Sequence, residues 1–418
     1  MDELIELLKR EVVPALGCTE PIAVALAVAR AREALGAQPE LIELHVSRNI
    51  LKNAMNVGIP GTGMKGLEIA AALSAVAGRS EYGLEVLRDA GPEDMPAARQ
   101  LRSQVHVALA DTDKALYIDA RVRHGGDCAR CVIEDAHANI TRVELNRVAL
   151  PLPERARADS VAAADAQGDV SLSLERIYAF ATGVPLERIA FLRRGMDMNL
   201  AIAREGLAGE YGMGVGRRLN QAGDAGYANY AAALTAAAAD ARMGGCTLPV
   251  MSTAGSGNQG LAATLPCIAV ARRLGSGEEA LLRAEALSQL VTIHIKAHIG
   301  KLSALCGCAI AASVGSACGI TYLLGGGLAA ICRAVQNMIA DISGLICDGA
   351  KAGCALKIAT GVGAAVQCAQ LAQAGGSADG HDGIVTADVE QSIANLGQLG
   401  ARGMMTADRV ILEMMMCK

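Results

Sequence analysis

The stretch LYIDARVRHGGDCARCVIEDAHANITRVEL, residues 116–145, decides the fold of the first half of the chain. It holds three strand-like runs, and short polar turns such as His124–Asp127 separate them. Similar runs occur at residues 41–46 and 105–109. Apolar side chains that alternate with polar ones are typical of strands with one buried face, so the pattern predicts a mostly antiparallel meander. We expect helices at residues 2–9, 20–35 and 64–78 to cover one face of this sheet.

The second half of the chain has a helical pattern almost throughout. Residues 151–168 precede it as a polar connector with two prolines, which is typical of a linker. The sequence thus predicts an α+β protein with two domains. Residues 1–150 should form an α/β domain with an antiparallel sheet, and this domain carries the Cys18 loop. Residues 169–418 should form a mostly all-helical domain. The expected helices begin with a capped start at Ser173 and continue at 198–208, 226–243, 278–299, 328–344 and 384–396.

The composition narrows the class of protein. Aromatic residues make up only 2% of a chain that is 52% hydrophobic, so small aliphatic side chains build the core and let helices pack closely. A formal net charge of −5 and the lack of a basic stripe argue against nucleic-acid binding and favour a small-molecule protein. The chain begins with an amphipathic pattern and not with a signal segment, so we expect a cytoplasmic protein.

One segment, Leu302–Cys332, has no charged side chain and is long enough to span a bilayer. It also contains six glycines and several hydroxyl side chains, and it lacks the aromatic belts that flank membrane helices. We therefore expect a buried central pair of helices here and no membrane contact. The alternative is a membrane carrier.

Thirteen cysteines in a chain without an export signal should be reduced thiols. Two of them, Cys347 and Cys354, flank a loop with two glycines. Such a loop can bend around an iron–sulfur cluster and direct N–H groups at its sulfurs, whereas zinc-finger spacing is missing. The alternative is a pair of core cysteines at a helix start. His294 and His298 stand one helical turn apart and could add metal ligands, although a core or interface role fits them better.

A second pair of thiols, Cys306 and Cys308, lies in the sequence SALCGCA. Thiols this close cannot easily both bind one iron site, so we expect at most one of them to be a ligand. Together with Cys347 and Cys354, that thiolate would hold a cubane cluster by three corners and leave one iron open as a Lewis acid.

Cys18 lies in the segment Gly17–Pro21, directly before an apolar helix. Cys18 or Thr19 could cap that helix. The N–H groups and the dipole at a helix N-terminus favour a thiolate, which would suit a general base or a nucleophile. A plain capping turn explains the same residues equally well.

Residues 252–260, with the sequence STAGSGNQG, open another helix and can cradle a carboxylate with hydroxyls and N–H groups. The core of this loop is similar to the substrate-carboxylate loop of pyridoxal-phosphate serine and threonine dehydratases. Those enzymes need a Schiff-base lysine upstream, and no lysine occurs between Lys114 and Lys296, so we expect no pyridoxal phosphate. The candidate substrate ligands are Thr253, Ser256, Asn258 and, from a glycine- and asparagine-rich loop that could wall the pocket, Asn53.

Taken together, these segments resemble the L-cysteine desulfidase family, also known as UPF0597, which is related to the iron–sulfur L-serine dehydratases. The combination is specific and extends over essentially the whole chain. The resemblance implies β-elimination on L-cysteine to give hydrogen sulfide, ammonia and pyruvate, with a [4Fe-4S] cluster as Lewis acid. The matching segments are residues 13–21, 53–63, 252–260, 298–308 and 347–357.

The resemblance also implies roles for individual residues. Cys347 and Cys354 match the paired cluster ligands, and Cys18 matches the general base. The third ligand is one of the two neighbouring thiols at 306 and 308, and the serine dehydratase pattern favours Cys306. Cys417 near the end of the chain could reach the open iron, but a tail without that role fits better.

Two other functions remain compatible with the residues. An L-serine dehydratase would use the same cluster with a different leaving group. A non-catalytic amino-acid sensor would use the thiols for a regulatory metal or for none. The partner we expect in either case is a small amino acid, and a homodimer is possible.

Overall fold

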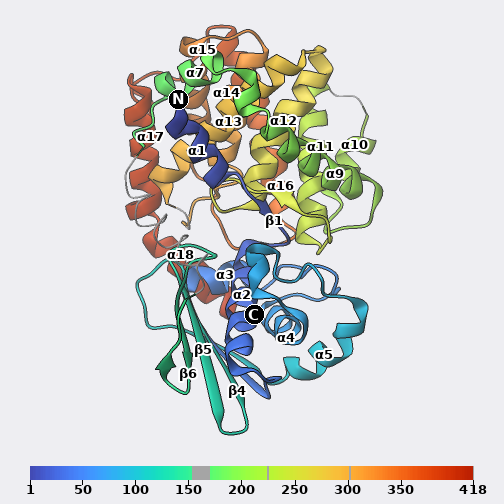
Figure 1. Ribbon diagram of the computed structural model, residues 1–418. Coiled ribbons are helices and arrows are strands. Elements are labelled where there is room, and N and C mark those ends of the chain that lie inside the picture. Colours follow the sequence, from blue (N-terminus) through green and yellow to red (C-terminus); the bar gives the residue numbers. More distant parts are fainter. Residues whose placement is uncertain (153–169, 224–225, 301–302, 418) are drawn as a thin grey trace.

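The computed structural model describes residues 1–152, 170–223, 226–300 and 303–417 (Figure 1). It forms two bodies stacked on one another, a smaller one built around a sheet and a larger helical one. The predicted α+β class, with an N-terminal sheet followed by a mostly helical region, is confirmed. The linker predicted at residues 151–168 lies outside the described residues except for its first two.

The smaller body contains a six-stranded sheet. Its strands are β2 (Leu41–Val46), β3 (Val105–Leu109), β4 (Tyr117–His124), β5 (Asp127–Glu134), β6 (Ile140–Leu145) and β7 (Val148–Ala149). They lie in the order β3-β2-β4-β5-β6-β7, and every pair is antiparallel except the parallel pair β2 and β3. Ile42, Leu44 and Val46 are fully buried at every second position of β2, which is the burial that the sequence alternation predicts.

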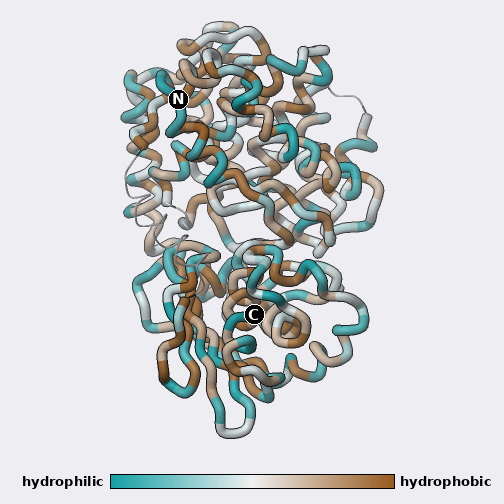
Figure 2. The backbone as a smooth tube through the Cα atoms, viewed as in Figure 1, coloured by the Kyte–Doolittle hydropathy of each residue, from teal (hydrophilic) through white to brown (hydrophobic). Residues whose placement is uncertain are grey.

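Helices α2 (Thr19–Leu35) and α4 (Leu67–Ala77) cover one face of the sheet, as expected. α2 packs across β4, β5 and β6 with small buried residues such as Ala23, Ala27 and Ala31, so it can lie close to the strands. α4 lies beside α2 and appears as a mainly apolar coil in Figure 2. The other helical segments of this body are α3 (Arg48–Ala54), η1 (Ser80–Glu85), η2 (Pro92–Asp94) and α5 (Met95–Arg102).

The prediction that the first helix covers the sheet is wrong. α1 (Asp2–Glu11) packs on the helical body, where Leu4, Ile5 and Leu8 are buried against α13 and its neighbours. The following strand β1 (Pro14–Ala15) pairs with β8 (Val250–Met251) and ties the chain to that body. An amphipathic helix can bury its apolar face on any apolar surface, so its sequence does not say which body it joins.

The helical body is built around α14, which lies in the middle of the segment without charges. All but the last two residues of α14 are buried, and it packs on α12, α13, α15 and α16. A Cβ on Gly315 would lie 2.4 Å from the carbonyl oxygen of Ser288, so glycine lets α13 and α14 approach closely. The helices are α7 (Leu174–Gly183), α8 (Leu186–Ile189), α9 (Leu192–Ala208), α10 (Val215–Gln221), α11 (Gly226–Met243), α12 (Gly257–Leu274), α13 (Glu278–Ile299), α14 (Ala311–Leu323), α15 (Leu328–Ile342), α16 (Cys354–Gln373), α17 (Val389–Gln398), η3 (Leu399–Gly403) and α18 (Met405–Met416).

The last helix, α18, crosses back to the sheet body. Leu412 packs in the core of that body, and Asp408 forms an ion pair with the buried ammonium of Lys52 on α3. Among the described helices, α16 is long and apolar enough to cross a membrane, and half of its apolar window is buried inside the molecule. The last helix therefore joins the sheet body, although the helices directly before it in the chain belong to the helical body.

Candidate active site

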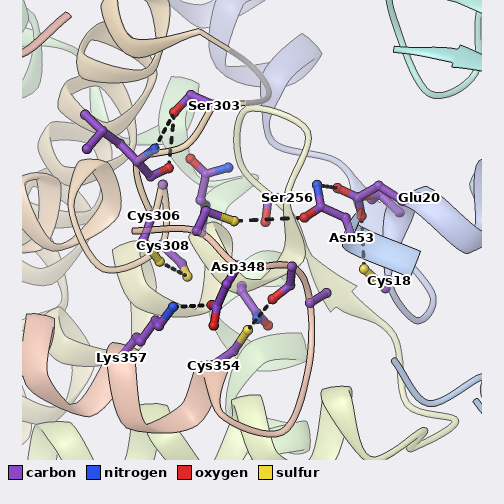
Figure 3. Close-up of a pocket in the computed structure, with 18 of the residues that line it drawn as sticks. Cys18, Glu20, Asn53, Ser256, Ser303, Cys306, Cys308, Asp348, Cys354 and Lys357 are labelled. Atoms are coloured by element: carbon purple, nitrogen blue, oxygen red, sulfur yellow. Dashed lines mark hydrogen bonds and ion pairs between the residues drawn. The ribbon is translucent and has the colours of Figure 1, made fainter. Parts of the chain in front are cut away.

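A cavity of about 80 Å³ lies at the junction of the two bodies, and Figure 3 shows side chains that line it. The sheet body contributes the start of α2 and the α3 helix. The helical body contributes α11, α12, α13, α16 and the loops that precede α14 and α16. The main polar and thiol-bearing lining residues are Cys18, Glu20, Asn53, Arg242, Ser256, Asn258, Gln259, Lys296, Cys306, Cys308, Cys347, Asp348, Cys354 and Lys357.

The structure brings most of the predicted site residues into this one cavity. Those that line it are Cys18, Asn53, Ser256, Asn258, Cys306, Cys308, Cys347 and Cys354. Thr253 does not line it: its side chain is fully buried, and its hydroxyl donates a hydrogen bond to Oε1 of Gln289 at 2.5 Å. Thr253 can therefore support the loop, but it does not face the cavity.

Three other candidates also lie away from the cavity. Nε2 of His294 lies 2.7 Å from Oε2 of Glu390, and Nδ1 of His298 donates to the carbonyl oxygen of His294 at 3.0 Å. His294 is buried and takes part in the packing of α13 against α17, which is the core role that fits its sequence better, whereas His298 is exposed on α13. Cys417 is exposed at the end of α18.

The N-terminus of α2 carries the polar half of the site. Cys18 is the N-cap residue, and its thiol donates to Oε2 of Glu20 at 3.0 Å. The hydroxyl of Thr19 donates to the same oxygen at 3.1 Å, and the amide of Asn53 donates to Oε1 at 3.2 Å. Glu20 is therefore a buried carboxylate that accepts three side-chain hydrogen bonds.

The electrostatic surroundings of Cys18 and Glu20 differ. Burial raises the pKa of the Cys18 thiol well above its ordinary value, and the neighbouring Glu20 carboxylate raises it further. Burial also acts to raise the pKa of Glu20, but His137, the Cys18 hydrogen bond and Arg242 together lower it below its ordinary value. The expectation that the helix N-terminus makes Cys18 a thiolate is wrong for this structure, because burial and Glu20 outweigh the helix dipole. Cys18 is a thiol that donates to a carboxylate.

Backbone pairing brings the thiol-bearing loops together. The N–H of Cys306 donates to the carbonyl oxygen of Leu345 at 2.9 Å, and the N–H of Cys347 donates to that of Ala304 at 2.6 Å. Cys354 begins α16, and its thiol donates to the carbonyl oxygen of Gly349 at 3.6 Å. Two loops that are about forty residues apart in the sequence therefore present their thiols to one cavity.

Gly349 has to be glycine for this loop to close. Its φ is +90°, and a Cβ there would lie 2.2 Å from the carbonyl oxygen of Lys52. An L side chain is strained at such a φ and would also overlap the backbone of α3. The glycine thus lets the loop between Cys347 and Cys354 lie against the sheet body.

The thiols are not equivalent. Cys306 Sγ and Cys308 Sγ are 3.4 Å apart, and the hydrogen bond from Cys308 lowers the pKa of Cys306 to about 7. The same hydrogen bond and burial raise the pKa of Cys308 well above its ordinary value. The thiolate is the metal-binding form of cysteine, and of these two thiols Cys306 is the one that loses its proton more readily.

Two ammonium groups face these thiols. Lys357 forms an ion pair with Asp348. Lys296 on α13 is 5% exposed, and no acidic side chain among the described residues forms an ion pair with it. Burial lowers its pKa to about 8, although Cys347 and Cys306 act in the opposite direction. A buried cation without a carboxylate partner indicates a site for an anion.

Four thiols of the helical body line one cavity, and this is a donor set that could hold an iron–sulfur cluster. In the described ranges, no three His, Cys, Asp or Glu side chains are close enough to share one metal ion. A cluster binds its cysteines at separate corners, so its ligands surround a cavity and need not meet at a point. Cys306, Cys347 and Cys354 approach the cavity from different segments and face the unpaired ammonium of Lys296.

Several residues of the cavity were missed from the sequence. Arg242 donates to Oδ1 of Asn258 at 3.0 Å and to the carbonyl oxygen of Gly17 at 2.6 Å, and it is 2% exposed. Gln259 lines the cavity with a buried Oε1 that has no hydrogen-bond partner among the described residues. The sequence signal that could have identified such residues is a charged side chain among the buried residues of a helix. Arg242 in α11 and Lys296 in α13 are examples.

Comparisons with known proteins identify the family of this chain. Residues 81–413 match the family described as Serine dehydratase alpha chain. A UPF0597 protein of Oleidesulfovibrio alaskensis is 47% identical, and the match covers 99% of this chain and 97% of the relative. UPF0597 proteins of Chromobacterium violaceum and Clostridium tetani are each 44% identical, covering 100% and 99% of this chain and 97% and 98% of the relatives. The chain therefore belongs to the UPF0597 family, a serine dehydratase-like family.

Proposed function

We propose that this protein is a lyase that eliminates the β-substituent of a small L-amino acid, with L-cysteine as the substrate and hydrogen sulfide, ammonia and pyruvate as the products. The observation that carries the proposal is the single cavity in which the Cys18–Glu20 pair faces four thiols and a buried ammonium. Elimination needs a group that takes the α-proton and a group that assists the leaving substituent. The two sides of the cavity can supply one each.

The thiol side would hold a [4Fe-4S] cluster through Cys306, Cys347 and Cys354. When bound, such a cluster supplies a Lewis-acidic iron for the leaving group. Lys296 places positive charge beside the thiolates and so offsets part of the cost of burying them. Cys308 keeps its proton and donates to Cys306, which supports the assignment of Cys306 as the third ligand. Pyridoxal phosphate has no part in this proposal.

The other side would hold and deprotonate the amino acid. Arg242, Asn258 and Ser256 line the cavity at the first turn of α12, where N–H groups and the helix dipole favour a carboxylate. Asn53 lies beside Glu20 and completes the wall. Cys18 would take the α-proton, a contribution that is typically worth about 10²–10⁴-fold in rate. Thr253 supports this loop through its hydrogen bond to Gln289.

L-Serine is the second candidate substrate, and the match to the family described as Serine dehydratase alpha chain favours it. Hydroxide and hydrosulfide differ by one atom, so the same cavity could serve either leaving group. The reduced thiols that the site needs are consistent with the cytoplasmic location that we propose.

Anaerobic purification, followed by iron and sulfide assays and turnover of L-cysteine and L-serine, tests the proposal. We expect iron and sulfide in the protein, and pyruvate from L-cysteine with a kcat/KM at least about tenfold above that for L-serine, a difference of about 1.4 kcal/mol. A higher kcat/KM for L-serine would establish the second candidate. A protein that contains iron but eliminates neither amino acid would support a sensor and contradict the proposal.

A further inference from the structure

The thiol of Cys18 donates to the carboxylate of Glu20 and is shielded from bulk solvent. Cys18 Sγ lies 3.0 Å from Glu20 Oε2, and the two residues are 3% and 8% exposed (Figure 3). We propose that Glu20 is the proton acceptor through which Cys18 works as a base, an inference that rests on the proposed elimination. Glu20 then belongs to the catalytic machinery together with Cys18.

A protonated cysteine cannot take a proton from the substrate until it gives up its own. The hydrogen of Cys18 is directed at Oε2 of Glu20, and only 3% of the residue is exposed. Burial and the adjacent carboxylate also make a free thiolate at this position costly. The one acceptor that is already hydrogen-bonded to the thiol is therefore the natural destination of its proton.

The step balances as follows. The α-proton of the substrate moves to Sγ of Cys18, while the thiol proton moves to Oε2 of Glu20. The Cα–H electron pair forms the Cα=Cβ bond, and the leaving group departs with the electron pair of its bond to Cβ. Glu20 ends as a neutral carboxylic acid, so the negative charge has passed from Glu20 to the departing hydrosulfide or hydroxide. No free thiolate forms at Cys18.

The surroundings of Glu20 suit this role. Thr19 and Asn53 fix the two oxygens by hydrogen bonds of 3.1 and 3.2 Å, so Oε2 stays aimed at the thiol. The charged or titratable groups that face it are Cys18, His137, whose Nε2 lies 4.0 Å from Oε1, and Arg242 and Lys296. The cationic neighbours keep the carboxylate ionised until a substrate proton arrives.

The variant Glu20→Gln tests the relay because it keeps the size and one acceptor oxygen of the side chain but removes the charge. The assay follows exchange of the α-proton of L-alanine for deuterium in D₂O by NMR, because L-alanine has no β-leaving group. Iron content and elimination from L-cysteine and L-serine are measured on the same anaerobically purified protein.

We expect Glu20→Gln to slow the exchange by at least about 100-fold, the lower end of a general-base contribution, at the iron content of the wild type. Glu20→Asp restores a carboxylate, and its exchange rate should be at least about tenfold higher than that of Glu20→Gln. Asp119→Asn is the matched control, because Asp119 is likewise a buried carboxyl, 3% exposed, and it accepts hydrogen bonds from Arg121 and Arg130 on the sheet, outside the cavity. Its exchange rate should stay within about threefold of the wild type.

Exchange by Glu20→Gln within about threefold of the wild-type rate, at full iron content, would overturn the relay. If Glu20→Gln loses iron or unfolds, the Glu20→Asp variant decides. An exchange rate of Glu20→Asp that is no faster than that of Cys18→Ala would also overturn the relay. Failure of the proposed function looks different: the wild type then exchanges the alanine proton but eliminates neither amino acid, and Glu20→Gln still tests the relay. A wild type that neither exchanges the α-proton nor eliminates either amino acid overturns both proposals. If the wild type eliminates L-cysteine without exchanging the alanine proton, the elimination rate of Glu20→Gln tests the relay in the same way.

Discussion

Replacing Glu285 with glutamine should remove a pH dependence of folding stability that this buried carboxyl creates between about pH 4.5 and 7. Glu285 lies on α13 and is 2% exposed. Its Oε1 accepts hydrogen bonds of 2.7 Å from Thr264 and from Gln289, while Oε2 has no hydrogen-bond partner among the described residues. Burial raises the pKa of Glu285 from 4.5 to about 7, although the two hydrogen bonds oppose the rise. Gln289 also accepts a hydrogen bond from Thr253, so Glu285 lies next to the side chains that support the loop at residues 252–260.

The sign of the effect follows from proton binding. The unfolded chain loses the Glu285 proton near pH 4.5 and the folded protein near pH 7, so the folded state binds more protons in between. The free energy of unfolding therefore falls as the pH rises through this window. Between pH 5 and pH 8 the loss is about 2.5 kcal/mol for a shift of this size. For a chain of 418 residues, this corresponds to about 3 °C in the unfolding midpoint.

Thermal unfolding of the wild type and of Glu285→Gln at pH 5 and pH 8 measures this difference. The midpoint of the variant relative to the wild type should rise by about 3 °C from pH 5 to pH 8. Glu279→Gln is the control, because it removes an exposed carboxylate from the same helix. A relative midpoint that does not change with pH, or that falls, would refute the reasoning that Glu285 is protonated in the folded protein.

Three further predictions concern the site itself. Cys18→Ser should lower turnover at least about 100-fold at unchanged iron content, and loss of iron would instead make Cys18 a ligand. Cys306→Ser should lose iron, whereas Cys308→Ser should keep most of it; the reverse would reassign the third ligand. Gly349→Ala should lower the unfolding midpoint by about 2 °C or more, because the new Cβ meets the Lys52 carbonyl, while Gly363→Ala, which meets nothing within 4 Å, should not.

Much of the sheet body follows from its sequence. The alternation in residues 41–46 and 140–145 matches strands with those bounds, because one face of each is buried and the other is not. The start at Ser173 is also confirmed, since its side chain accepts the N–H of Arg176. The placement of α1 did not follow, because an apolar stripe such as Leu4 and Leu8 specifies burial but not the surface that provides it.

The site residues also divide into those that the sequence indicates and those that only the packing of the fold brings to the cavity. Loops rich in glycine and small polar residues marked Cys18, Asn258 and Cys354, since short motifs carry their own geometry. Arg242 and Lys296 reach the cavity from long helices, and only the packing of those helices brings them there. Glu20 was inside a recognised motif, but its role depends on the direction in which the neighbouring thiol points, which the residue order does not encode.

The most direct test of the central claim is the stoichiometry of products from L-cysteine with anaerobically purified protein. Sulfide and pyruvate should appear in a ratio of about one to one, at a rate proportional to the iron content of the preparation. Cys354→Ser should abolish both products together. Iron-containing protein that releases no pyruvate from L-cysteine or L-serine, or a Cys354→Ser variant that retains the wild-type rate, would contradict the account.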